Sequence, residues 1–252
     1  MAKSIKSYTE EYMKDYGFEA EMVRYRRELL LERLAHYAPR KVVELGCGTD
    51  LQATGYHAQG GEWDHWIVVE PSLEFADCAR HCGLPNMMVI QDFFENVGSK
   101  ILANPNLLLC SGLLHEVPDA DILIEAMRAQ MGPETVLHVN VPNARSMHRQ
   151  LAQAMGLIED LKSISPRNAA LQQPRVFDMQ SLVAQFARHS LKVVHSGGYF
   201  VKPFTHHQME PLVRHLGRDV MDGLFALGKK EPDIASEIYV EVVIESADIP
   251  TD

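Results

Sequence analysis

Cysteine is scarce in this sequence: it has four in 252 residues, too few for a secreted fold built on disulfides. No stretch approaches the roughly 18 uninterrupted apolar residues that predict a membrane-spanning helix. The first 18 residues are polar and charged and lack the apolar core of a signal peptide, so we expect a cytoplasmic protein. Basic residues are outnumbered, with 24 Lys and Arg against 34 Asp and Glu and a net charge of −10. This balance argues against a partner that is a nucleic acid.

Short apolar stretches alternate with stretches of helical periodicity along the chain, which contains 46% hydrophobic and 23% charged residues. Seven strands are predicted, at residues 41–45, 66–70, 87–92, 107–111, 135–141, 191–195 and 237–244. Helices are predicted at residues 12–37 (with a possible break at Gly17), 73–82, 119–131 and 177–189. Alternation of this kind predicts an α/β fold, with a mostly parallel seven-stranded sheet and helices on both faces. We expect a single domain over residues 1–252, with ligands at the carboxyl ends of the strands.

Two segments interrupt the alternation: residues 143–176 and residues 203–235. Both begin just after the carboxyl end of a strand, and each contains a helical pattern. Together with residues 1–37, they are predicted to form a cap over the ligand site. The apolar helix at residues 209–227 has an alternative role, which is to pack in a homodimer.

The most specific motif is the stretch Glu44-Leu-Gly46-Cys47-Gly48, where a strand runs into a glycine turn that opens a helix. Glycine tolerates positive φ and lets the backbone come close to a ligand. No Gly-Lys-Ser/Thr follows, and Leu51 stands where a dinucleotide-binding loop would have its third glycine. With Glu44 two residues before the first glycine, the stretch resembles motif I of the class I S-adenosylmethionine-dependent methyltransferases.

Later motifs extend that resemblance in the expected order. An acidic residue after strand two holds the ribose hydroxyls in this family, and Glu70 in Val-Val-Glu70-Pro71 matches it. Asp92 matches the residue that contacts the adenine amino group, with Phe93 beside the ring. Residues 110–119 resemble motif IV. The resemblance implies a Rossmann-like fold, S-adenosylmethionine as cofactor and S-adenosylhomocysteine as product. The implied cofactor-binding residues are Glu44, Gly46, Cys47, Gly48, Glu70, Pro71, Asp92, Phe93 and Ser111.

Two departures from the family pattern affect the cofactor site. Asp50 stands near the place of a third glycine, which alters how the methionine part is held. Glu70 lies 26 residues after Glu44, a longer interval than the roughly 20 residues between comparable elements. Residues 55–64 look like the insertion, and Glu62 or Asp64 is the alternative ribose ligand.

Leu114-His115-Glu116 resembles the Leu-His-Asp-Trp stretch of small-molecule O-methyltransferases, in which the His is the general base. Imidazole suits this work because its pKa lies near neutrality. Glu116 is a candidate to orient His115, or to lie near the start of the next helix. We therefore expect methyl transfer to a hydroxyl oxygen of a small molecule of natural-product or sugar type. The alternatives are a structural His115, an N-methyltransferase, and a non-catalytic module that binds a cofactor or a partner.

Polar residues after strands five and six are predicted to contact the acceptor. Ser146 and Arg149 share a helix face, and a guanidinium there suits a carboxylate or phosphate. A solvated, N-capped helix and a plain surface loop are the alternatives. His148 is a further catalytic candidate. The predicted substrate-binding residues are Asn143, Ser146, Arg149, Tyr199, Lys202 and His206.

Two further expectations concern charged and metal-ligating residues. No metal site is expected, because the histidines lack tight ligand spacing. One of Arg24, Arg26 and Arg27 is expected either to pair with the cofactor carboxylate or to form part of a solvated face.

Overall fold

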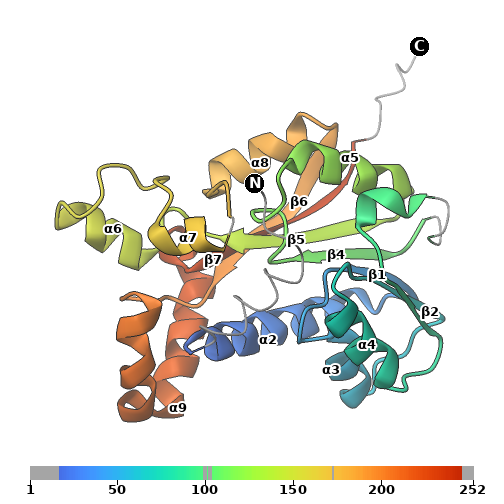
Figure 1. Ribbon diagram of the computed structural model, residues 1–252, viewed down its shortest axis with the longest axis horizontal. Coiled ribbons are helices and arrows are strands. Elements are labelled where there is room, and N and C mark those ends of the chain that lie inside the picture. Colours follow the sequence, from blue (N-terminus) through green and yellow to red (C-terminus); the bar gives the residue numbers. More distant parts are fainter. Residues whose placement is uncertain (1–16, 99–100, 102–103, 172, 246–252) are drawn as a thin grey trace.

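Seven strands form one sheet in the order β3-β2-β1-β4-β5-β7-β6 (Figure 1). The computed structural model describes residues 17–98, 101, 104–171 and 173–245. The first five strands run parallel, whereas β7 is antiparallel to both β5 and β6. The strands are β1 (Lys41–Leu45), β2 (His65–Val69), β3 (Met87–Ile90), β4 (Leu107–Ser111), β5 (Val136–Pro142), β6 (Leu191–Tyr199) and β7 (Glu237–Ile244).

Helices cover both faces of the sheet, as predicted. In Figure 1, α5 and α8 lie above it, and α2, α3 and α4 lie below it. Each layer buries its own apolar cluster against the strands. The helices are α2 (Glu19–Tyr37), α3 (Gln52–Ala58), α4 (Leu73–His81), α5 (Ala120–Gln130), α6 (Met147–Ala154), α7 (Pro166–Ala170), α8 (Met179–Ala187) and α9 (His206–Lys230), with short 3₁₀ turns η1 (Phe94–Asn96) and η3 (Pro232–Ile234).

Element boundaries differ from the prediction mainly at β6. This strand continues to Tyr199, four residues beyond the predicted end, because it keeps pairing with β7. Gly197 and Gly198 hid the continuation, since glycine does not favour strands. Both glycines are needed there: a Cβ on Gly197 would lie 2.8 Å from the Tyr239 hydroxyl oxygen, and one on Gly198 would lie 2.7 Å from the Ala235 Cβ.

From the predicted cap, α6, α7 and α9 gather beyond the carboxyl ends of β5 and β6, at the left of Figure 1, whereas α2 lies below the sheet. In α9, Gly217 leaves helical geometry (φ 75°, ψ 168°) and kinks the helix. α9 packs against α2, where the Tyr25 ring lies 4.9 Å from the Phe200 ring and 5.0 Å from the Phe225 ring, centroid to centroid. This side of α9 is therefore buried within the chain, and homodimerisation stays a prediction. The part of the predicted cap at residues 1–16 lies outside the described residues.

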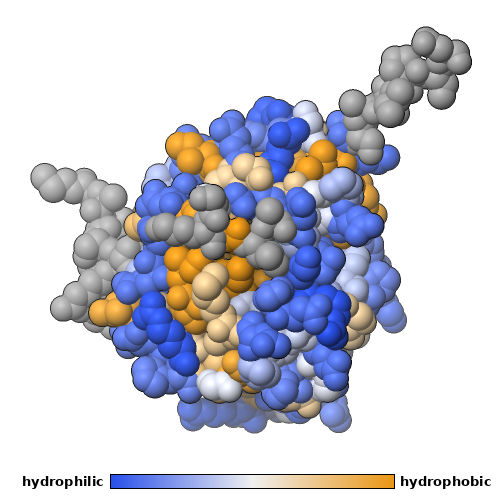
Figure 2. Space-filling view, turned by 90° about the vertical axis from the view of Figure 1, so that its right-hand side faces the viewer, coloured by the Kyte–Doolittle hydropathy of each residue, from blue (hydrophilic) through white to orange (hydrophobic). Residues whose placement is uncertain are grey.

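The surface seen in Figure 2 is mostly hydrophilic, with the largest group of hydrophobic residues left of its centre and smaller groups near the edges. None of the helices in the described part of the chain combines the length and the apolar character that crossing a membrane requires.

Candidate active site

A cavity of about 840 Å³ opens at the carboxyl ends of the parallel strands. We call its two sides the glycine-loop half, lined from β1, β2, β4 and the loops that follow them, and the cap half, lined from α2 and from residues 142–176 and 202–237. Most of the residues predicted from the sequence line the cavity: Glu44, Gly46, Cys47, Gly48, Glu70, Pro71, Phe93, Ser111, His115, Glu116, Asn143, His148, Arg149, Lys202 and His206. Asp92, Ser146 and Tyr199 are not among its lining residues.

The glycine loop turns sharply because Gly46 (φ 65°) and Gly48 (φ 52°) adopt left-handed conformations. Glu44, at the end of β1, is almost fully buried and accepts two hydrogen bonds. The Gln52 backbone N–H donates to its Oε1 at 3.0 Å, and the Trp66 indole N–H donates to its Oε2 at 2.9 Å. Burial raises the pKa of Glu44 to about 7 despite these donors. Through these two hydrogen bonds, Glu44 links β1, just before the glycine loop, to α3 and β2.

Glu70, at the end of β2, faces the glycine loop. Its Oε2 accepts from the Gly48 N–H at 3.1 Å, and its Oε1 accepts from the Ser72 N–H at 2.8 Å. The Cys47 thiol also donates to Oε2, at 3.9 Å. A carboxylate has about four acceptor positions, so at least one remains for a hydroxyl donor. Burial raises its pKa. The alternative ribose ligands, Glu62 and Asp64, both pair with Arg40 before the amino end of β2, and neither is among the residues that line the cavity.

Two further positions of the glycine-loop half were singled out in the sequence. Asp92 Oδ1 accepts from the Phe93 N–H at 2.8 Å, which holds the half-exposed Phe93 at the cavity wall. Asp50, at the place of the missing glycine, pairs with Arg27 of α2 at 2.5 Å. The departure at Asp50 thus ties α2 to the glycine loop.

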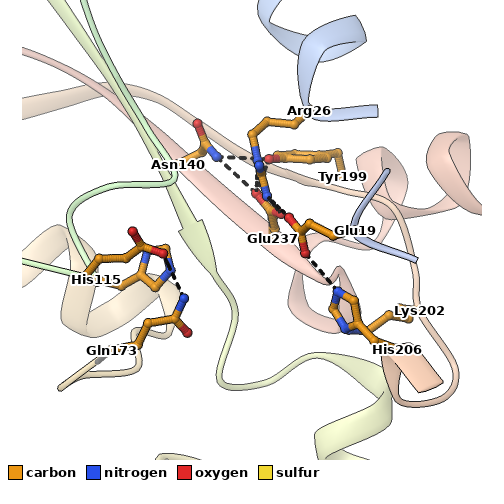
Figure 3. A network of polar contacts seen from close by, with 10 residues as sticks. Glu19, Arg26, His115, Asn140, Gln173, Tyr199, Lys202, His206 and Glu237 are labelled. Carbon is orange, nitrogen blue, oxygen red and sulfur yellow. Dashed lines mark hydrogen bonds and ion pairs between the residues drawn. The ribbon is translucent and has the colours of Figure 1, made fainter. Parts of the chain in front are cut away.

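His115 lies in the loop after β4, between the two halves, and is 5% exposed. Its Nε2 lies 3.7 Å from Glu116 Oε1, and its Nδ1 has no hydrogen-bond partner within the described part of the chain. Burial lowers the pKa of His115 to about 4, so the ring is neutral near pH 7. Gln173 Nε2 donates to Glu116 Oε1 at 2.9 Å (Figure 3).

A polar network crosses the cap half and is centred on Glu237, the first residue of β7 (Figure 3). Arg26 of α2 donates to both Glu237 oxygens, at 3.1 and 2.5 Å. Asn140 Nδ2 donates to Glu237 at 3.0 Å, and the Tyr199 hydroxyl donates to the same carboxylate. Arg26 therefore does not lie on a solvated face, although it lines the cavity. Tyr199 is fully buried as part of the wall behind the cavity.

The network continues from Arg26 to the loop after β6. Arg26 Nη2 lies 3.2 Å from Glu19, and Glu19 also accepts from His206 Nε2 at 3.0 Å. His206 can donate there because its Nδ1 accepts from Lys202 Nζ at 2.7 Å. Two of the predicted substrate-binding residues, Lys202 and His206, are thus brought together at the cavity.

Residues after β5 have mixed roles. The Asn143 side chain donates to backbone carbonyls of residues 232–235, and Arg149 donates to the carbonyls of Leu161 and Ser163 at 2.8 and 2.5 Å. Both contacts brace the cap. Ser146 Oγ and His148 Nδ1 are buried and find no partner among the described residues. Burial, with Lys202 nearby, lowers the pKa of His148 to about 2.

Sequence reasoning missed Glu237, Glu19 and Gln173. The available signal was in β7, where Glu237 and Glu241 stand inside a β-branched stretch. Charged residues in a strand that is otherwise apolar require buried partners. In the described residues, no group of three His, Cys, Asp or Glu side chains is arranged to hold a metal ion.

A family model described as a methyltransferase domain matches residues 10–196. The chain belongs to this family. A search of curated proteins found no match.

Solved structures share the fold of this methyltransferase at low sequence identity. The plantazolicin methyltransferase BamL, in complex with a triazolic desmethylPZN analog and SAH, matches with a TM-score of 0.57 and 13% identity over 96% of this chain and 97% of its own. A putative S-adenosylmethionine-dependent methyltransferase from Listeria monocytogenes gives 0.55 and 11%, over 88% and 99%. The N-methyltransferase NodS from Bradyrhizobium japonicum WM9, in complex with SAH, gives 0.52 and 11%, over 93% and 91%.

The methyltransferase uses S-adenosylmethionine, and its glycine-loop half fits that cofactor. Glu70 retains acceptor capacity for a ribose hydroxyl. Gln52 Oε1 is a buried oxygen at the cavity that receives no hydrogen bond within the described residues, and it suits the cofactor ammonium. The acidic lining of this half also suits the positive sulfonium.

Proposed function

We propose that the methyltransferase methylates a hydroxyl oxygen of a small molecule, with His115 as general base. The observation that carries this proposal is the state of His115: a neutral imidazole at the cavity wall, with Nδ1 buried and unpartnered within the described residues. Proton removal requires an unprotonated ring nitrogen whose lone pair is free to accept the proton.

Each half of the cavity has its own task in this proposal. The bound cofactor supplies an electrophilic methyl group on its sulfonium. Glu70 and the glycine loop orient the cofactor, and Phe93 flanks its adenine, with Asp92 behind it as the predicted adenine contact. His115 Nδ1 accepts the hydroxyl proton as the O–H bond breaks, which leaves the electron pair on the acceptor oxygen. The methyl carbon would bond to that oxygen as its bond to sulfur breaks, and S-adenosylhomocysteine would leave. A base with a depressed pKa favours an acidic hydroxyl, such as a phenol, over an aliphatic alcohol.

The cap half selects the acceptor in this proposal. α2 and residues 143–176 and 203–235 supply its wall, and Lys202, His148 and His206 are the proposed acceptor contacts. BamL, a structural neighbour bound to a natural-product analog, supports an acceptor of that kind.

An acceptor nitrogen is the second candidate. NodS, an N-methyltransferase by its description, supports it. A neutral amine already carries its lone pair and needs no general base to attack.

The test combines a panel of phenols, sugar alcohols and amines with variants of His115. His115→Ala should lower the rate on a hydroxyl acceptor by about 10²–10⁴-fold, the usual contribution of a positioned base. His81→Gln, on the exposed surface of α4, is the control and should retain full activity. An unchanged rate for His115→Ala contradicts the role of His115. Methylation of amines alone would select the second candidate.

A further inference from the structure

Gln173 is a polar residue of the cap that the cavity chemistry above does not use. It follows α7 in the chain, lines the cavity and is 9% exposed. Its amide donates to Glu116 Oε1 at 2.9 Å, across 57 positions of sequence. Burial makes that bond costly to lose, because an unpaired amide in an apolar setting has no water to replace its partner.

The orientation of the Gln173 amide follows from a chain of hydrogen bonds behind it. Asn168 Nδ2 donates to Gln173 Oε1 at 2.8 Å, and Ser165 Oγ donates to Asn168 Oδ1 at 2.5 Å. With Oε1 of Gln173 accepting from Asn168, its Nε2 is left to donate to Glu116. Every donor in this chain therefore points from the cap toward Glu116.

Glu116 in turn faces one particular nitrogen of His115. Its Oε1 lies 3.7 Å from His115 Nε2, whereas Nδ1 lies buried with no partner in the described part of the chain. A carboxylate beside Nε2 favours the imidazole tautomer that carries its proton on Nε2. In that tautomer, the lone pair of Nδ1 is free to accept a proton. Other charges that face the ring are Glu237 of β7 together with Glu19 and Arg26 of α2.

We propose that Gln173, which follows α7, and Glu116 are positioning residues that hold His115 with its proton on Nε2, so that the base works through Nδ1. The proposal rests on the function proposed for His115. It adds that the cap segment that carries Gln173 lines the cavity and also sets the tautomer of the base.

The experiment observes the two ring nitrogens of His115 directly by NMR of protein labelled with ¹⁵N-histidine, without cofactor or acceptor. His115→Gln identifies the signals by their loss. Gln173→Met keeps the length of the side chain and removes its amide donor, and Glu116→Gln removes the carboxylate. Gln185→Met is the matched control, because Gln185 is also 9% exposed and donates to a carboxylate, that of Asp121, at 2.6 Å.

Wild-type protein should show Nε2 protonated and Nδ1 unprotonated. Glu116→Gln should shift the tautomer ratio toward Nδ1–H about tenfold and Gln173→Met roughly threefold, in line with the loss of contacts to a charged group. Gln185→Met should leave both signals in place. A protonated Nδ1 in the wild type, or unchanged signals in Glu116→Gln or in Gln173→Met, would overturn the proposal. If Gln173→Met does not fold, Glu116→Gln still tests the proposal.

The two proposals fail in distinguishable ways. If His115→Ala keeps its activity while the tautomer responds as described, His115 is not the base although the positioning contact is real. If the tautomer is unchanged in Glu116→Gln and Gln173→Met while His115→Ala is inactive, His115 is the base and the positioning role of the cap segment is wrong.

Discussion

The two halves of the cavity hold their charges in different ways. In the glycine-loop half, Glu44 and Glu70 accept from backbone N–H groups and one indole, through bonds between residues 2 to 22 positions apart. In the cap half, charged side chains hold one another: Arg26 and Glu237 are 211 positions apart, and Glu19 and His206 are 187 apart. The first half is built from local backbone geometry and the second from tertiary contacts between side chains.

This difference predicts where substitutions act. Removing a carboxylate from the glycine-loop half leaves backbone N–H donors without their acceptor. Water or a ligand in the cavity can then accept from them, so the loss of stability is small. Removing a charge from the cap half leaves an opposite charge buried without a partner, which is far more costly.

The largest effect is expected for Arg26→Met. It leaves the buried Glu237 carboxylate without its cation, and the loss should be about 3–5 kcal/mol of unfolding free energy. Urea denaturation followed by circular dichroism measures it. Arg40→Met is the control, because Arg40 makes its ion pairs at the exposed surface. If the two variants unfold at the same urea concentration, the two halves do not differ in this way.

His115 should make the protein less stable in acid. Its pKa of about 4 lies below the unfolded value of 6.5, so its contribution is complete above pH 6.5 and is lost as the pH falls toward 4. The loss should reach about 3 kcal/mol. Denaturation of His115→Gln between pH 7 and pH 4 should show a flatter profile than the wild type. An equally steep profile would mean that the ring is not held neutral.

Glu44 should act in the opposite direction. Its pKa of about 7 lies above the unfolded value of 4.5, so its contribution is complete below pH 4.5 and is lost as the pH rises through 7. The change should again be about 3 kcal/mol. Glu44→Gln should flatten the profile between pH 5 and pH 8. If the wild-type stability is already constant over that range, Glu44 is not buried as described.

Glu70→Ala should weaken binding of S-adenosylhomocysteine about 100-fold, since it removes hydrogen bonds to a charged acceptor. Isothermal titration calorimetry measures the change. Glu62→Ala is the control: Glu62 is an exposed carboxylate beside β2 and should leave the affinity unchanged. Equal affinities for both variants would remove Glu70 from the cofactor site.

Ser146→Ala should have the smallest effect on stability. Ser146 is the N-cap of α6 but makes no capping bond, and its hydroxyl is buried without a partner in the described residues. Asp178, in the capping box of α8, provides the comparison, and Asp178→Ala should cost about 1 kcal/mol. Thermal unfolding distinguishes the two. Weaker acceptor binding by Ser146→Ala without loss of stability would assign the hydroxyl to the substrate.

The sheet and the glycine-loop half were predictable because their signals are short-range. Gly46 and Gly48 mark positive φ, and the apolar strands mark buried, mostly parallel pairing. Glu237 was not predictable as a centre of the cap half, because its partners come from α2, β5 and β6, which a local motif does not specify. Gln173 was missed for the same reason. Asn143 and Arg149 were expected at the acceptor, but their polar groups brace backbone carbonyls, a role that only the folded cap reveals.

The antiparallel strand β7 has a consequence for the order in which the molecule can assemble. β7 lies between β5 and β6, and its Glu237 and Glu241 take Arg26 and Arg33 of α2 as partners. During synthesis, the strands of the glycine-loop half emerge first and pair with close neighbours. The cap half of the cavity waits for a strand near residue 240, and closing so long a loop is slow. A nascent chain therefore has its glycine loop before the cap half can close, and pairing of β7 completes the cavity.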